Sequence, residues 1–143
     1  MALKQLTVFV ENKQGTLVTV TDTLAAHNVN IRALSIAETD GFGILRLIVD
    51  DEAKAEQVLT QAGYLIKITE VVGVKIGDAP GKLSYVLRTL ADAGINMEYL
   101  YAFMARTERH AYVVLRVENN EETEAVLENA GLHIITDADV NKL

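Results

Sequence analysis

The chain has 143 residues but no cysteine, and this absence excludes several kinds of chemistry. Disulfide bonds, thiolate metal ligands and cysteine nucleophiles all require a thiol group. The three histidines, His27, His110 and His133, have no spacing typical of metal ligands. The sequence also lacks a recognisable nucleophile–base set and a glycine-rich phosphate-binding loop. We therefore expect no metal, no cofactor and no catalytic residue.

Basic residues are also scarce. The chain has 13 Lys and Arg against 20 Asp and Glu, which gives a formal net charge of −7. A nucleic-acid-binding surface needs clustered Lys and Arg to neutralise phosphates, and here the basic residues are scattered. No apolar run approaches the length that spans a membrane, and the first residues do not resemble a signal peptide. We expect a soluble, cytoplasmic protein that binds neither nucleic acid nor membranes.

What the sequence does contain is an internal repeat. Gly15 and Asn30, at the two ends of a predicted helix, recur 66 residues later as Gly81 and Asn96. An internal repeat of this kind indicates that one structural unit occurs twice.

A second pair of landmarks extends the repeat. Gln61-Ala62-Gly63 recurs 68 residues later as Asn129-Ala130-Gly131, so the second copy carries two additional residues between the landmarks. No cluster of Pro, Ser or Gly separates the copies, and a flexible linker is therefore not expected. We predict two small domains, residues 1–70 and residues 71–143, with a fixed relation to each other.

Each copy reads as strand, helix, strand, strand, helix, strand. In the first copy we predict strands at 3–10, 31–38, 43–49 and 65–69, a helix at 16–27, and a helix from 50–52 to Gly63. In the second copy we predict strands at 71–76, 96–104, 112–117 and 133–137, a helix after Gly81, and a helix at 121–129.

The apolar residues of the predicted helices recur at helical spacing and are expected to face a core. They are Leu17, Val20 and Leu24 in the first helix; Ala55, Val58, Leu59 and Ala62 in the second; and Leu83, Val86, Leu87, Leu90 and Ala91 in the third.

With these motifs in register, the chain resembles the ACT domain family, small amino-acid-sensing modules with a βαββαβ ferredoxin-like plait. The second copy carries the family motif as Asp78, Pro80, Gly81, Leu83, Asn96 and Met97. The first copy carries it as Asn12, Gly15, Leu17, Asn30 and Ile31, with Gln14 in place of the proline. The resemblance implies an α+β fold of two such plaits in tandem, each an antiparallel sheet with helices on one face.

The chemistry of the motif suits a free amino acid. The first turn of a helix offers unpaired N–H groups and a positive partial charge to a carboxylate. Gly15 and Gly81 lack a Cβ, so a ligand can approach the backbone closely. An oxygen of Asn12 or Asp78 can accept a hydrogen bond from an ammonium group, and Asp78 would do so with charge assistance.

In ACT domains the ligand commonly lies between neighbouring domains. The resemblance implies that Asn12 faces Asn96 and Met97, and that Asp78 faces Asn30 and Ile31; the sequence leaves open whether such a site forms within one chain or across a homodimer. The implied ligand-binding residues are Asn12, Gln14, Gly15, Thr16, Leu17, Asn30, Ile31, Asp78, Pro80, Gly81, Lys82, Leu83, Asn96 and Met97.

An aromatic stripe is independent of the resemblance. Met97, Tyr99, Tyr101 and Phe103 alternate along one predicted strand, so all four are expected on one face. Their counterparts in the first copy are Ile31, Ala33, Ser35 and Ala37, which are mostly smaller. We hypothesise that the two strands lie close together and that the aromatic side chains fill the space left by the small ones.

The sequence favours a non-catalytic regulatory protein that binds a free amino acid and acts through its oligomeric state or a partner enzyme of amino-acid metabolism. The neighbouring apolar and aromatic side chains suggest an amino acid with a bulky apolar or aromatic side chain. Two other functions stay open: a ligand-free oligomerisation scaffold, which the missing proline of the first loop favours, and a small enzyme on the same plait. The glycines could also serve only as tight turns, and the asparagines only as helix ends.

Overall fold

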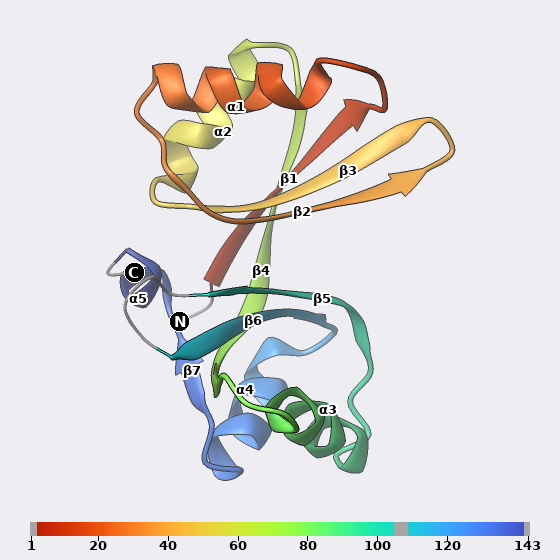
Figure 1. The fold of residues 1–143 in the computed structure, drawn as a ribbon, viewed down its shortest axis with the longest axis vertical. Helices are drawn as coiled ribbons and strands as arrows, with labels where there is room; N and C mark the ends of the chain where they lie inside the picture. Colours follow the sequence, from red (N-terminus) through yellow and green to blue (C-terminus); the bar gives the residue numbers. More distant parts are fainter. Residues whose placement is uncertain (1–2, 105–108, 142–143) are drawn as a thin grey trace. The chain divides into compact units, whose positions relative to one another are not determined.

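The computed structural model describes residues 3–104 and 109–141 (Figure 1). The first half contains β1 (Leu3–Glu11), α1 (Thr16–Ala26), β2 (Ile31–Thr39), β3 (Phe42–Val49) and α2 (Glu52–Gln61), and β4 (Leu65–Gly77) follows. The second half contains α3 (Lys82–Asp92), β5 (Met97–Met104), β6 (His110–Val117), α4 (Asn120–Asn129), β7 (His133–Ile135) and α5 (Asp137–Val140). We expect a hairpin at 105–109 between the predicted strands at 96–104 and 112–117, and its residues 105–108 lie outside the described part.

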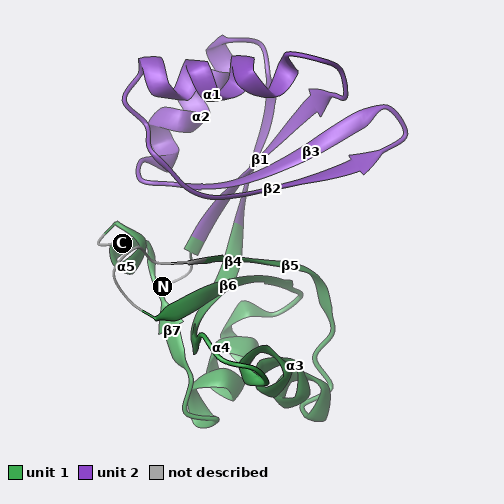
Figure 2. Cartoon of the chain, viewed as in Figure 1, with its two compact units in different colours: residues 1–3, 70–143 green, residues 4–69 purple. Residues whose placement is uncertain are grey.

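The chain forms two compact units (Figure 2). The N-terminal unit comprises residues 4–69 and is purple in the figure; the C-terminal unit comprises residues 1–3 and 70–143 and is green. Each unit is described separately below.

The N-terminal unit has the strand order β2-β3-β1-β4. Leu6, Val8 and Val10 alternate along β1 and are buried, whereas the intervening Phe9 is 38% exposed. The buried face of the sheet packs against α1 and α2. The core of this unit consists of Leu6, Val8, Val10, Val20, Leu24, Val29, Leu45, Leu47, Val49, Ala55, Val58 and Leu59.

The C-terminal unit repeats this arrangement with the strand order β5-β6-β4-β7, and the described pairings are antiparallel. Helices α3 and α4 cover one face of its sheet (Figure 1). The core consists of Val72, Val74, Ile76, Val86, Leu90, Val113, Leu115, Val117 and Leu127. Both units therefore place a first-helix N-terminus just after the end of a core strand.

Strand β4 is longer than predicted. The sequence predicts two strands, 65–69 and 71–76, whereas Leu65–Gly77 is one continuous strand that begins in the N-terminal unit and ends in the C-terminal unit. The predicted break between these strands at Glu70 is wrong. Glu70 is flanked by β-branched residues, and no turn-forming residue interrupts the strand.

The C-terminal strand is shorter than predicted. We predicted a strand at 133–137, but β7 ends at Ile135 and α5 begins at Asp137. Thr136 and Asp139 form a capping box, in which the Thr136 N–H donates to Asp139 Oδ2 at 2.9 Å and the Asp139 N–H donates to Thr136 Oγ1 at 3.4 Å. The Thr-x-x-Asp spacing is a recognised start signal for a helix.

Most of the predicted helix faces are correct, with exceptions near the helix ends and at Leu87 in the middle of α3. Val20, Leu24, Val86 and Leu90 are buried, but Leu17 is 39% and Leu83 is 38% exposed. Leu87 is half-buried, and Ala62 and Ala91 are exposed. Helical periodicity sets the direction of a side chain but does not ensure that another element covers it. None of the described helices is long and apolar enough to cross a bilayer.

Candidate ligand-binding site

Two glycines hold the same unusual backbone conformation in the two units. Gly15 is the N-cap of α1 with φ 87° and ψ −11°, and Gly81 is the N-cap of α3 with φ 89° and ψ −11°. This left-handed region strains any residue that has a Cβ. A Cβ built on either glycine would meet no atom within 4 Å. The backbone angle alone therefore requires glycine, and the space beside each cap is open.

The first turns of α1 and α3 also lack side-chain caps. Neither helix has a side-chain hydrogen bond at its N-cap. By contrast, Asp51 caps α2 by accepting from the Lys54 N–H at 3.1 Å, and Asn119 caps α4 by accepting from the Glu122 N–H at 3.0 Å. The glycine-led helices thus leave N–H donors uncapped at the positions where α2 and α4 have a side-chain acceptor.

The open donors belong to the second and third residues of each helix. No acceptor within the described residues bonds the backbone N–H of Leu17, Val18, Leu83 or Ser84. The first N–H group of each helix is hydrogen-bonded: Thr16 donates to the Lys13 carbonyl and Lys82 to the Ala79 carbonyl, each at 3.3 Å. Two neighbouring N–H groups at a helix start form a natural seat for a carboxylate.

The polar residues that open each loop are held through their backbones. The Asn12 N–H donates to the Gly41 carbonyl at 3.0 Å, and the Asp78 N–H donates to the Arg109 carbonyl at 3.3 Å. Both side chains are exposed. The structure therefore fixes their position beside the glycine-led helix while leaving the side-chain oxygens open to solvent.

The two loops differ in their charged residues. In the first loop, Lys13 Nζ lies 2.7 Å from Glu11 Oε2. This hydrogen bond and charge attraction lower the pKa of the Glu11 carboxyl and raise the pKa of the Lys13 amine. Gln14 is exposed and Thr16 half-buried. In the second loop a lysine begins the helix itself: the Lys82 N–H donates to the Ala79 carbonyl at 3.3 Å.

The other predicted site residues lie at the opposite ends of the helices. Asn30 precedes β2, where its N–H donates to Asp50 Oδ1 at 2.9 Å and its carbonyl accepts from the Asp50 N–H at 3.1 Å. Asn96 directly precedes β5. A helix of 11 residues is about 16 Å long. Within one unit, the glycine loop and the start of the second strand therefore lie at opposite ends of the first helix.

Ile31 and Met97 do not follow the predicted alternation. A bulge shifts the register between Met97 and Tyr99, and Met97 packs against the core together with Leu100. The prediction that Met97 shares a face with the tyrosines is therefore wrong, because one inserted residue reverses the side-chain direction. Ile31 likewise packs against its own core, and a similar irregularity in β2 lies between Ile31 and Ala33.

The remaining aromatic stripe lies on the sheet face away from the helices. Tyr99 pairs with Arg116 across the strands, and Phe103 pairs with Tyr112. The rings of Phe103 and Tyr112 stack, with centroids 5.3 Å apart and an interplanar angle of 20°. This stacking shows that at least one member of the stripe packs within its own sheet.

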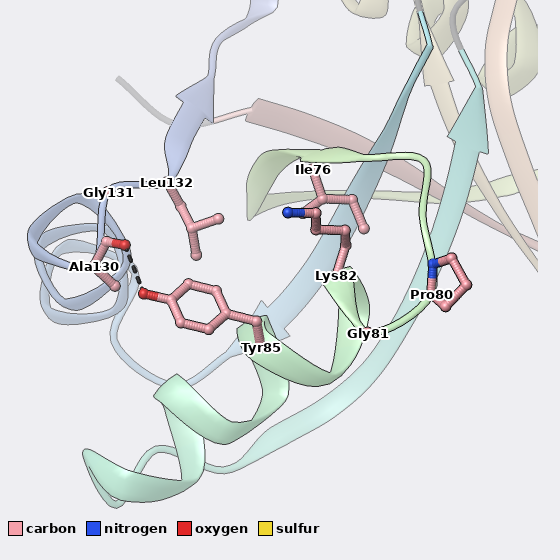
Figure 3. Close-up of a pocket in the computed structure, with 8 residues that line it drawn as sticks. All are labelled: Ile76, Pro80, Gly81, Lys82, Tyr85, Ala130, Gly131 and Leu132. Carbon is pink, nitrogen blue, oxygen red and sulfur yellow. Dashed lines mark hydrogen bonds between the residues drawn. The ribbon is translucent and has the colours of Figure 1, made fainter.

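A pocket that the sequence did not predict lies beside the second loop (Figure 3). Its volume is about 460 Å³, and it is lined by Ile76, Pro80, Gly81, Lys82, Tyr85, Ala130, Gly131 and Leu132. The Tyr85 hydroxyl donates to the Ala130 carbonyl at 2.8 Å and joins α3 to the end of α4. Of these eight residues, only Pro80, Gly81 and Lys82 were predicted to bind a ligand.

The repeat contained a signal for the missed residues. In a βαββαβ plait the first helix begins, and the second helix ends, at the same end of the sheet. The landmark Ala130-Gly131 therefore had to lie near Gly81, although some 45 residues separate the two segments.

Two βαββαβ plaits in tandem, each with a glycine-led first helix, define a protein of paired ACT domains. Residues 1–143 match the family described as ACT domain pair, and the chain belongs to this family. The resemblance found in the sequence and the predicted fold class are both confirmed.

Solved structures agree with this assignment. A protein of Bacteroides thetaiotaomicron is 40% identical with a TM-score of 0.92, and the match covers 100% of this chain and 98% of that one. The regulatory subunit of aspartate kinase from Thermus thermophilus, in a ligand-free form, is 18% identical with a TM-score of 0.64; the match covers 89% and 91% of the two chains. At this identity the second likeness concerns the fold. Among curated proteins, no match was found.

Proposed function

We propose that this protein is a non-catalytic regulatory protein that binds a free amino acid at its glycine-led helix starts. One observation carries the proposal: both copies keep a left-handed, side-chain-free cap at Gly15 and Gly81 with unbonded N–H groups behind it. Two N–H groups and the positive helix end suit the α-carboxylate.

The side chains of the second loop suit the rest of the ligand. The exposed carboxylate of Asp78 would accept hydrogen bonds from the ammonium group, and Lys82 adds positive charge near the ligand carboxylate. A neighbouring domain would supply Asn30 and Ile31 to this second loop. In the same manner, Asn96 and Met97 would face the first loop at Asn12. We propose domains 1–70 and 71–143 as the partners, within one chain or across a homodimer.

The route of the signal follows from the same proposal. The Thermus protein of similar fold is a regulatory subunit of aspartate kinase. This supports a role in which the present chain, in the cytoplasm, reports amino-acid binding to a partner enzyme of amino-acid metabolism. Regulation of this kind requires that the amino acid binds one state more tightly than another.

A thermal-shift screen of the free amino acids tests the proposal. A ligand at a hundred times its Kd stabilises the folded state by about 2.7 kcal/mol, which raises Tm by several degrees in a small protein. Asp78→Ala should remove the response of the second loop, while Asp92→Ala, at the exposed far end of α3, should keep it. If no amino acid raises Tm in the unsubstituted protein, the proposal is wrong.

A ligand-free oligomerisation scaffold is the second candidate. Two observations favour it: Gln14 replaces the loop proline, and Leu34 and Ile36 are 50% and 51% exposed on the edge strand β2. Sedimentation of Ile36→Lys separates the candidates. A scaffold loses its oligomer without any effect of amino acids, whereas a sensor keeps its amino-acid response.

A further inference from the structure

The pocket of the C-terminal unit is built from one domain alone. The end of β4 contributes Ile76, and the loop before α3 contributes Pro80 and Gly81. Helix α3 contributes Lys82 and Tyr85, and the segment after α4 contributes Ala130 to Leu132. Its volume of about 460 Å³ falls in the range of small-molecule sites. It is complete without a neighbouring domain, unlike the amino-acid site proposed above.

The walls of the pocket are mainly apolar. Figure 3 shows the side chains of Ile76 and Leu132 and the ring of Tyr85 around a common space, with Pro80 at its edge. Burying hydrocarbon against such walls is favourable at about 25 cal/mol per Å². The walls therefore suit the aliphatic body of a ligand.

The pocket contains one charged group, the ammonium of Lys82. This side chain folds over Gly77, where an added Cβ would lie 3.4 Å from Lys82 Cε. Figure 3 shows its amine directed into the space between Ile76 and Leu132. Within the described residues no ion-pair partner is recorded for Lys82, and no Asp or Glu lines the pocket. Lys82 is exposed, and its ammonium beside the apolar walls favours a ligand with an anionic group on an apolar body.

The hydrogen bond of Tyr85 occupies a backbone carbonyl that could otherwise attract a ligand ammonium group. Carbonyls at a helix end attract ammonium groups. The Tyr85 hydroxyl donates to the Ala130 carbonyl at 2.8 Å and thereby satisfies this acceptor. The pocket thus offers the Lys82 ammonium to a ligand carboxylate, but it has no Asp or Glu to pair with a ligand amine.

The N-terminal unit lacks this combination. Thr16 and Thr19 stand at the positions of Lys82 and Tyr85, and the bulkier Tyr64 stands at the position of Leu132 and packs against the core. The features of this pocket are therefore specific to the second copy.

We propose that this pocket binds a small aliphatic monocarboxylate, with Lys82 pairing its carboxylate and Ile76, Leu132 and the Tyr85 ring enclosing its hydrocarbon. The ligand needs no amino group. The pocket shares Pro80, Gly81 and Lys82 with the proposed amino-acid site, and Ile76, Tyr85 and Leu132 set it apart. It is tested with a ligand that has no amino group, so its outcome is distinct from the amino-acid response.

Calorimetric titration of the full chain with isocaproate and with isocaproamide tests the charge requirement. The two probes have the same shape, but only the acid is charged. Isocaproate should bind once per chain and the amide about tenfold more weakly, because a charge-assisted hydrogen bond is lost. Equal affinity for the two probes, or no binding of isocaproate, would overturn the proposal.

Two variants assign the binding to the pocket. Lys82→Gln should abolish the preference for the acid, whereas Lys67→Gln, the same charge loss on an exposed strand position of the other unit, should keep it. Leu132→Tyr introduces the residue of the N-terminal unit and should remove isocaproate binding. If Leu132→Tyr does not fold, as judged by circular dichroism, Tyr85→Thr tests the same wall. Retention of isocaproate binding in the folded variant would contradict the proposal.

The outcomes separate the two proposals. Binding of isocaproate without any thermal response to amino acids leaves this inference standing and removes the amino-acid function. An amino-acid response without isocaproate binding does the reverse.

Discussion

The two units share a backbone feature but differ in the side chains around it. Gly15 and Gly81 cap their helices with φ of 87° and 89° and the same ψ of −11°. Around this common cap, the first loop holds an exposed Glu11–Lys13 ion pair, and the second holds Lys82 beside an apolar pocket. The open backbone donors are thus common to both units, while the side chains around them differ.

A second difference lies on the first core strand of each unit. Gly73 on β4 corresponds to Thr7 on β1. A Cβ at Gly73 would lie within 2.8 Å of two Ile135 side-chain atoms and 3.0 Å from Leu3 Cδ2. Glycine is therefore needed in the C-terminal unit because the fully buried Ile135 packs directly on the strand.

The largest effect is expected at this glycine. Gly73→Ala should lower the free energy of unfolding by about 1–3 kcal/mol, because the methyl group overlaps Ile135 in a tightly packed core. Gly77→Ala on the same strand is the control, since its Cβ would lie no closer than 3.4 Å to any atom. Urea unfolding measures both. Equal losses at the two positions would show that Ile135 does not impose the glycine.

The caps give the next largest effect. Gly15→Ala and Gly81→Ala should each lower stability by about 1–2 kcal/mol, because a Cβ strains the left-handed backbone. The losses should be similar, since neither Cβ would contact another atom. Asn tolerates this conformation, so Gly→Asn should lose less at both sites. A large loss at one cap only would contradict the equivalence of the two units.

The smallest effect concerns Glu124 on α4. Partial burial raises the pKa of its carboxyl first, and the nearby Glu128, Glu121 and Glu70 raise it further. A raised folded-state pKa means that ionisation opposes folding, so this penalty is absent at low pH and grows as pH rises through the unfolded and then the folded pKa. Glu124→Gln should therefore raise Tm slightly at neutral pH and have little effect in acid. Glu56→Gln, at the matching position on α2, is the control, because it removes one carboxylate from the equivalent helix of the other unit. A gain that does not change with pH would contradict this explanation.

Sequence periodicity and the repeat predicted the topology of both units because each core face follows the period of its element. The alternation of Leu6, Val8 and Val10 and the spacing of Val20 and Leu24 were sufficient for this. The exposed Leu17 shows the limit, because a pattern along one element does not reveal which other elements cover it.

The site was less predictable for two physical reasons. A single bulge before Tyr99 reversed the direction of Met97, and no residue type marks that position as irregular. The pocket depends on Tyr85 reaching Ala130, a contact between distant segments that local patterns do not contain. Only the topology of the plait, applied to the repeated Ala-Gly landmark, brings these segments together.

The central claim is that open backbone donors at the glycine-led helix starts bind an amino-acid carboxylate. Backbone amide NMR during titration with a free amino acid that raises Tm tests it most directly, with the decarboxylated amine of that amino acid as the control. We predict that the amide signals of Leu17, Val18, Leu83 or Ser84 shift with the amino acid and do not shift with the amine. Equal shifts with both compounds, or shifts confined to other parts of the chain, would contradict the claim.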